Sequence, residues 1–371
     1  LQAAEKAQAA VTATDIIQMK DTLQQAVDNY LTFTPLSVVP ESRFNVNPPK
    51  NWTTACGTYT GGDQRVNSYN SVAFWNAWWS GINASEGENM TMEIKQDITN
   101  LTHGYYTLSC KAMTEHFCLS DQHAYLTADD QTTVSPALTA DYYDLATTLN
   151  MPAANIWQKL TTTPVYVEQG GTVTIGFKSS KAGATDDLWH KIGGQNGNSP
   201  TNDVHDKREG WWGATEFVLN RALGYRAEVT PQQFGAICLP YGVRPTDGLH
   251  FYNVSGITED HQYLCLSEVT EVDKGKPFIY RCDNALAVFS GFGTEKKLPT
   301  SDELFLGYFT SNKVGEGYYV VVDGEWQRLS GTTDVPMYSV VIKKDAVTNL
   351  IEISEWDEGP LMPISGADID F

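Results

Sequence analysis

Three separated segments with the residue alternation of β-strands constrain the fold of this chain most strongly. They span residues 89–112, 165–180 and 210–219. MTMEIKQDI in the first segment alternates apolar and polar residues, as half-buried strands do, and YYTLSCKAM alternates again after the turn sequence NLTHG. VYVEQGGTVTIGF places two β-rich runs around Gly170 and Gly171, a pattern typical of a hairpin. Together the segments predict a β-sandwich that displays loops.

The rest of the chain divides into regions of different pattern. Residues 1–35 are alanine-rich and then apolar at spacings of three and four, which predicts a short helical hairpin that ends at Pro35. Residues 36–50 contain three prolines and few apolar residues, and so indicate a linker. The sandwich is expected in residues 51–225. Short strands separated by turn residues over 226–371, with a hairpin turn at Asp323-Gly324, predict a second all-β domain.

Charge and hydropathy exclude two classes of partner. The formal net charge is -20, which disfavours binding to a phosphate backbone, so nucleic acid is not an expected partner. No run reaches the roughly 18 apolar residues that a membrane-spanning helix needs. The sequence begins at Leu1 rather than at a methionine, from which we expect a removed leader and a secreted or outer cell-surface location.

The cysteines do not predict a disulfide scaffold. The chain has six, three on each side of position 225, and no CxxC or zinc-finger spacing. We expect several buried free thiols, with at most one disulfide in each half.

Residues 51–222 resemble a known family. One strand-turn-strand pattern matches at Gln96, Ile98, Leu101, Gly104, Tyr106 and Leu108. With HAYLTADD at 123–130, GGTVTIGF and the closing GWWGATEFVL, this pattern resembles the galactose-binding-like jelly rolls of glycan-foraging gut bacteria. The resemblance implies a jelly-roll sandwich and carbohydrate binding. Gly210 stands where the family has an aspartate, so a metal or polar network that depends on that aspartate does not transfer.

The two ends of the chain carry further resemblances. Residues 1–35 are similar to the tail of a FIVAR-type helical spacer of bacterial surface proteins. AICLPYGV, FYNVSGI, GKPFIYR and YYVVVDGEWQRL resemble a β-rich module that ends many secreted proteins of the same bacteria. No activity follows from that module.

Tryptophan is concentrated in the first 225 residues, and FWNAWWSG at 74–81 is its densest group. An aromatic plane can stack on the apolar face of a sugar ring, which makes tryptophan a candidate glycan contact. If this segment is a strand, Trp75 and Trp79 share one face and Trp78 lies on the other. We expect Trp75 in the core. Trp78 and Trp79 fit either the core or a surface platform.

The long stretch at 181–210 is the second candidate site, because loops of this length are commonly functional or disordered. Its candidate sugar ligands are Asp187, Trp189, His190, Asp206 and Arg208. Carboxylates and a guanidinium can bind sugar hydroxyls, and the indole can stack on a ring. The alternative is a solvated Gly- and Asn-rich loop in which only Trp189 packs inward.

Metal and catalytic chemistry find less support. Glu115, His116, Cys118, Asp121 and His123 crowd one strand end, but no second cluster completes a zinc site. We therefore expect no cofactor. A structural calcium is compatible with the fold, although the sequence does not locate it. No GxSxG, HExxH, P-loop or GxGxxG motif occurs, so no enzyme activity is expected.

These patterns lead to one main hypothesis, a non-catalytic, secreted or cell-surface protein whose sandwich loops bind a glycan or oligosaccharide. The first alternative is a structural protein or adhesin whose β modules bind a surface protein or act as spacers. The second is an accessory part or fragment of a glycoside hydrolase, which would need two carboxylates facing across a sugar.

Overall fold

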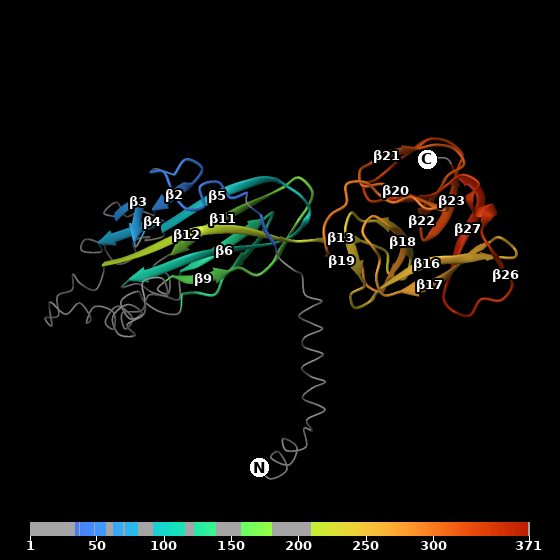
Figure 1. The fold of residues 1–371 in the computed structure, drawn as a ribbon, viewed down its shortest axis with the longest axis horizontal. Helices are drawn as coiled ribbons and strands as arrows, with labels where there is room; N and C mark the ends of the chain where they lie inside the picture. The colour runs from blue at the N-terminus through green and yellow to red at the C-terminus, as the bar shows by residue number, and fades with distance from the viewer. Residues whose placement is uncertain are drawn as a thin grey trace, which may run out of the picture. The chain divides into compact units, whose positions relative to one another are not determined.

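The computed structural model describes residues 34–36, 38–47, 49–56, 62–69, 71–80, 92–115, 122–138, 157–179 and 209–369. The chain divides into two units, one formed by Phe33–Ala222 and one that holds Leu223–Phe371. We call them the sandwich unit and the C-terminal unit (Figure 1). The predicted helical hairpin lies outside the described residues, apart from Thr34 and Pro35, which begin a strand.

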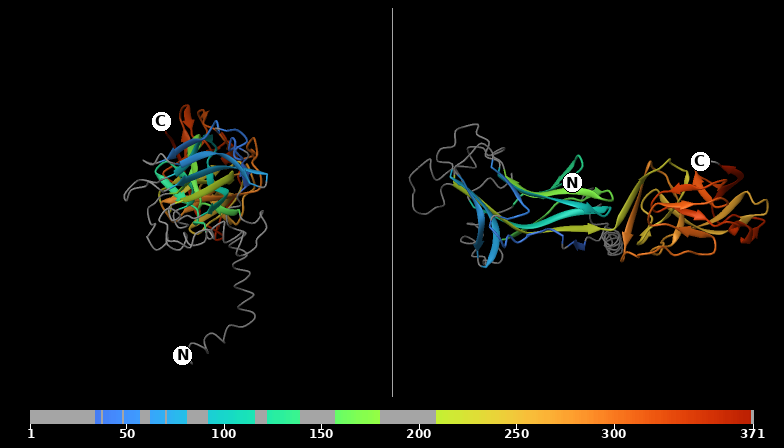
Figure 2. Two further views of the ribbon diagram at one scale, coloured as in Figure 1. Left: turned by 90° about the vertical axis from the view of Figure 1, so that its left-hand side faces the viewer. Right: turned by 90° about the horizontal axis from the view of Figure 1, so that it is seen from above.

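The sandwich unit consists of two antiparallel sheets, and the right-hand view of Figure 2 shows its strands in two layers. The first sheet has the order β10 (Val165–Val167), β6 (Gly104–Glu115), β12 (Glu209–Ala222), β4 (Val72–Ser80) and β3 (Gly62–Tyr69), with β1 (Thr34–Leu36) beside β12 and β9 (Gln158–Thr161) beside β6. The second has the order β2 (Thr53–Cys56), β5 (Met92–Leu101), β11 (Gly171–Ser179), β7 (His123–Ala128) and β8 (Gln131–Val134).

The core of this unit follows from the alternation in the sequence. In β5, Ile94 and Ile98 are buried, and Glu93 and Asp97 lie on the opposite face. Leu108 of β6 is fully buried in the same core cluster, which joins the two sheets. Burial of each such side chain contributes about 1.5–3 kcal/mol. The mainly β fold predicted from the sequence is therefore confirmed.

The expected hairpin around Gly170 and Gly171 is wrong. β10 pairs with β6 in the first sheet, whereas β11 pairs with β5 and β7 in the second. The turn itself is present, because the Gly171 N–H donates to the carbonyl of Glu168 at 2.9 Å. All three residues of β10 are buried. Their apolar side chains are therefore buried by placing β10 in the first sheet, and not by pairing it with β11, its neighbour in sequence.

The C-terminal unit is also built from short strands. Its long sheet has the order β14 (Phe234–Cys238), β18 (Pro277–Cys282), β16 (Leu249–Thr258), β17 (Tyr263–Val269), β27 (Leu361–Ile369), β23 (Glu325–Leu329), β22 (Tyr319–Val322), β25 (Val340–Ile342) and β20 (Phe305–Gly307), with β26 (Glu352–Ile353) beside β16. β13 (Gly224–Glu228), β19 (Leu286–Phe292) and β15 (Gly242–Arg244) form a second sheet, and β21 (Asn312–Val314) pairs with β24 (Thr333–Val335). Within the described residues, the one helical element is a 3₁₀ turn at Ala346–Asn349.

The long sheet curls until its first strand comes near its last ones, because β14 contacts both β22 and β25. The fully buried Trp326 lies inside the curl and stacks near Phe305 at 5.8 Å. The hairpin predicted at Asp323-Gly324 is confirmed: it joins β22 to β23, and both turn residues have positive φ. That conformation is typical of a two-residue type I′ turn.

The described cysteines agree with the expectation of buried free thiols. Those whose side chains are described are all free and buried, namely Cys110, Cys238, Cys265 and Cys282. Over the described ranges, no helix is long and apolar enough to span a membrane.

Candidate functional site

The loop residues selected from the sequence fall outside the described residues. These are Asp187, Trp189, His190, Asp206 and Arg208. The strands on either side of this stretch are described, and they belong to different sheets: β11 ends at Ser179 in one, and β12 begins at Glu209 in the other. The position of the loop residues relative to one another therefore stays a prediction.

Trp78 and Trp79 lie in β4, whose backbone pairs with β3 on one side and with β12 on the other. The register sets Trp78 opposite Trp211 of β12, and Trp79 opposite Gly210. Directly opposed positions on antiparallel strands belong to the same face of the sheet, with their Cβ atoms about 4.5–5.5 Å apart. Two tryptophan positions are thus neighbours across β4 and β12.

The same register extends this pair into a row across four strands. Asp63 of β3 lies opposite Trp78, and Glu115 of β6 lies opposite Trp211. Read across the sheet, the order is carboxylate, tryptophan, tryptophan, carboxylate. We call these four positions, Asp63, Trp78, Trp211 and Glu115, the tryptophan row. Alternation along the strands places the row on the face opposite to the sandwich core, because Ala77 and Trp212 belong to the core face.

The positions next to the row are firmly packed. Phe74 lies on the same face of β4 and is only 3% exposed, and its ring meets that of Trp157 edge-on at 5.4 Å. Met113 of β6 is fully buried. Gly213 leaves room for these side chains, because a Cβ at this position would lie 2.6 Å from Phe74 Cδ2. A second apolar layer therefore supports the sheet beside the row.

Several other tryptophans of the sandwich unit are structural. Trp75 is 3% exposed and belongs to the core cluster, as expected from the sequence, and so does Trp52. Trp212 is fully buried, stacks near Phe177 at 4.7 Å and donates from Nε1 to the Ser179 hydroxyl at 2.8 Å.

The ionisable groups with perturbed pKa values in this unit are kept neutral. Burial raises the pKa of the Cys110 thiol. Burial, followed by the hydrogen bond to Glu93, raises the pKa of the Tyr125 hydroxyl. Both groups are protonated at neutral pH, and neither lies in the tryptophan row. They contribute packing rather than acid–base chemistry.

The candidate metal cluster is described only in part. His116, Cys118 and Asp121 lie outside the described residues. Glu115 belongs to the tryptophan row, and the Nδ1 atom of His123 is buried without a hydrogen-bond partner. Where the chain is described, no group of three or more His, Cys, Asp and Glu side chains comes together as a metal site.

Sequence reasoning did not select Asp63 or Trp211, and it considered Glu115 only as part of the candidate metal cluster. Strand β3 was not expected, although Asn70 and Ser71 between two β-like runs are a turn signal, and Ser71 has a positive φ of 65°. Trp211 was visible in GWWG, but its partner depends on register. Register is a tertiary property that a single strand pattern does not fix.

Comparison with known proteins does not assign the chain to a family. No protein-family model matches the chain, and no curated protein matches it. A structure of TmCBM61 in complex with β-1,4-galactotriose is 14% identical, with 50% of this chain and 97% of that chain covered and a TM-score of 0.29. The K3 cleaved adhesin domain of Lys-gingipain from Porphyromonas gingivalis W83 is 14% identical, with 48% and 95% covered and a TM-score of 0.27.

A candidate sugar-binding protein from Bacteroides thetaiotaomicron VPI-5482 is 9% identical, with 50% of this chain and 100% of that chain covered and a TM-score of 0.28. With TM-scores below 0.5, none of these likenesses assigns the chain to a family.

Proposed function

We propose that the protein is a non-catalytic carbohydrate-binding protein and that the tryptophan row is its glycan-binding surface. The observation that supports this proposal is the register that makes Trp78 and Trp211 neighbours, with Asp63 and Glu115 at either end. Two adjacent indoles offer a flat apolar surface long enough for more than one sugar ring. Flanking carboxylates can accept hydrogen bonds from the hydroxyl groups around the ring edge.

The row is better suited to a neutral glycan than to an acidic one. Its two ionisable members are both carboxylates, and the chain as a whole carries a net charge of -20. Uronates, sulfated sugars and sialylated chains would therefore meet electrostatic repulsion. A shallow surface of this kind binds weakly, with a Kd in about the millimolar to micromolar range.

The loop and the row form one proposed site. The stretch that carries Trp189 and Arg208 continues directly into β12 at Glu209, two residues before Trp211. We therefore assign Asp187, Trp189, His190, Asp206 and Arg208 to contacts with sugar hydroxyls and rings beside the row. Trp79 has the same strand parity as the core residues Trp75 and Ala77, so its position lies on the face of β4 opposite to the row and it is not assigned to the site. Such a role fits a secreted or cell-surface protein that binds glycans outside the cell.

Glycan-array screening of the full chain, followed by isothermal titration with the best neutral oligosaccharide, tests the proposal. Trp78→Ala and Trp211→Ala should each weaken binding, because each removes about 1.5–3 kcal/mol of apolar contact, or roughly 10- to 150-fold in Kd. Trp78→Phe keeps an aromatic face and should retain part of the affinity. Asp129→Asn, at an exposed turn between β7 and β8, is the control for Asp63→Asn.

Two results would count against this function. One is a folded protein that binds no sugar on the array. The other is a measurable affinity that neither Trp78→Ala nor Trp211→Ala changes, while circular dichroism confirms that both variants are folded. Retention on a surface protein, lost in the same two variants, would instead favour the adhesin alternative.

A further inference from the structure

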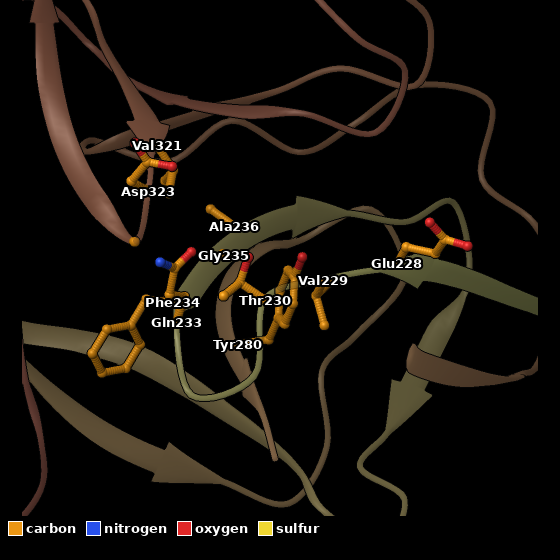
Figure 3. Close-up of a pocket in the computed structure, with 11 residues that line it drawn as sticks. Glu228, Val229, Thr230, Gln233, Phe234, Gly235, Ala236, Tyr280, Val321 and Asp323 are labelled. Carbon is orange, nitrogen blue, oxygen red and sulfur yellow. The ribbon is translucent and has the colours of Figure 1, made fainter. Parts of the chain in front are cut away.

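The C-terminal unit contains a groove that is separate from the tryptophan row. Two adjoining hollows, of about 280 and 230 Å³, lie over strand β14 and share Ala236, Tyr280 and Val321 among their lining residues. Figure 3 shows the larger hollow, with Tyr280 at its floor and Asp323 on the facing hairpin. Because the groove belongs to the other unit, a ligand site there is independent of the function proposed for the sandwich.

The floor of the groove is the ring of Tyr280, which lies over Gly235 of the neighbouring strand. Gly235 lies opposite Tyr280 in the β14–β18 pair, and a Cβ at Gly235 would come within 2.4 Å of Tyr280 Cζ and 2.5 Å of its Oη. The Tyr280 and Phe289 rings pack edge to face, with their centres 5.1 Å apart. Burial raises the pKa of Tyr280 to about 12, so its hydroxyl carries a proton at neutral pH.

The two walls of the groove present free strand edges. Cys238 of β14 donates its N–H across the groove to the carbonyl of Tyr338 at 2.9 Å, so alternate residues of β14 direct their backbone groups away from β18. Ala236 lies two residues before Cys238, so its N–H and C=O also point away from β18. On the facing side, Val322 and Glu325 close the two-residue turn, which leaves the N–H and C=O of Val321 on the outer edge of β22.

The groove is closed at both ends. The Cys238–Tyr338 hydrogen bond closes one end. At the other, a Cβ on Gly324 would lie only 3.3 Å from the Phe234 nitrogen, so the hairpin turn abuts β14 there. An extended peptide strand needs an open path along both edges, with neighbouring strands about 4.8 Å away on each side. A compact ligand fits this enclosure, and an added strand does not.

The polar groups of the larger hollow select the charge of such a ligand. Glu228 and Asp323 place carboxylates at the rim, and Thr230 and Gln233 add hydrogen-bonding side chains. No lysine or arginine lines either hollow. The Arg281 guanidinium lies 5.9 Å from the centre of the Phe234 ring, so an anionic ligand in the larger hollow would meet two carboxylates at the rim and one cation beside Phe234. In the smaller hollow the Ser339 hydroxyl is buried without a partner, which supplies one more hydrogen-bonding group.

We propose that this groove binds a single neutral sugar residue. Its larger hollow, of about 280 Å³, lies just below the range of ligand pockets, which run from about 300 Å³ upward, and so fits a single sugar ring rather than a larger molecule. The Tyr280 ring offers the sugar an apolar floor, and its hydroxyl can donate to a ring hydroxyl. The free backbone edges at Ala236 and Val321 and the rim carboxylates supply the remaining donors and acceptors.

Saturation-transfer difference NMR on the full chain tests this assignment, with galactose, glucose and N-acetylglucosamine as neutral probes and galacturonate as the acidic one. Tyr280→Phe removes one hydroxyl and keeps the ring over Gly235, and should weaken binding about tenfold. Tyr263→Phe is the matched control, because Tyr263 is in the same unit and outside the groove. Asp323→Asn removes one of the two rim carboxylates, so it should raise the affinity for galacturonate by a larger factor than it lowers the affinity for the neutral sugars.

The double variant Trp78→Ala/Trp211→Ala separates this site from the one in the sandwich. Sugar binding that survives this change but falls in Tyr280→Phe supports the groove. The assignment is overturned if no neutral probe gives a signal with the wild-type chain, if Tyr280→Phe and Tyr263→Phe behave alike, or if galacturonate binds as well as galactose. Loss of all binding in the double variant would also overturn it, and would leave the tryptophan row as the sugar site.

Discussion

Gly213 of β12 is the position where one added methyl group should disturb the proposed glycan surface most. A Cβ there would lie 2.6 and 2.8 Å from two ring carbons of Phe74 and 3.4 Å from Met113 Cε. Ordinary carbon–carbon contacts are about 3.5–4.0 Å, so one group must move by about 1 Å. Phe74 is 3% exposed and its ring packs edge-on against that of Trp157, so the ring has little room to yield.

The expected cost of Gly213→Ala follows from this crowding. Overpacking a closely packed site costs about 1–3 kcal/mol. With a urea m-value of about 2 kcal/mol/M, the unfolding midpoint should fall by about 0.5–1.5 M. Gly315→Ala is the control, because nothing lies within 4 Å of a Cβ at that glycine. It should leave the midpoint nearly unchanged.

A double-mutant cycle tests the cause as well as the size of the effect. Phe74→Leu alone should destabilise by about 1–2 kcal/mol through lost burial. Because leucine vacates the space that the added methyl needs, the double variant should be more stable than the sum of the two changes predicts, by about 0.5–3 kcal/mol. Chemical unfolding followed by circular dichroism measures all four corners. Strict additivity, or a Gly213→Ala midpoint equal to that of the wild type, would refute the packing argument.

Two further predictions concern buried polar groups, one in each unit. Arg221 is 7% exposed and donates hydrogen bonds from Nε and an Nη to the carbonyl of His103, at 3.0 and 2.6 Å. Lysine cannot form this fork, so Arg221→Lys should lower the free energy of unfolding in urea by about 1–3 kcal/mol. An unchanged unfolding midpoint would contradict this. Burial raises the pKa of Tyr280 to about 12 from an ordinary 10, and that of Cys238 to about 12 from 9. The unfolded chain therefore loses these protons first, and the C-terminal unit should be destabilised as pH rises from about 9 to 12. Tyr280→Phe should remove about 2–3 kcal/mol of that loss, and an equally steep pH dependence in the variant would show that Tyr280 does not contribute.

The sequence predicted the strands well where one face is buried and the other is not. In β5 the alternation of residues 92–98 matches the observed burial, because the strand has one face on the core. The Asp323-Gly324 hairpin was equally predictable, since a two-residue turn with positive φ is encoded by the turn residues themselves. Both features depend only on neighbours in sequence.

The failure at Gly170-Gly171 has a physical cause. A glycine pair permits a tight turn, but it does not decide whether the strands on either side pair or separate into two layers. In β10 every residue is buried, so both of its faces need apolar partners. Pairing with β6, while β11 joins β5 and β7, satisfies that demand. The sequence carries this choice only in the packing of residues far away along the chain.

The sequence indicated which kind of residue the candidate site contains, but not how those residues are arranged across the sheet. The tryptophan density of 74–81 pointed to β4, but the four-position row needs the registers of three strand pairs at once. A shift of one residue in any pair would move Trp78 or Trp211 to the opposite face from its neighbour. Register is set by the buried face of the sandwich, and so the tryptophan row depends on how the core packs.

An irregularity in β12 reconciles the core with the tryptophan row. The pairing of β12 with β6 shifts between Thr215 and Val218, and Glu216 there has a positive φ of 51°. Before the shift the even-numbered Trp212 faces the core; after it the odd-numbered Phe217 does, with 1% exposure. A regular strand would put Phe217 on the same face as Trp211. The bulge therefore allows the same strand to hold the Trp211 position on the outer face and still complete the core with Phe217.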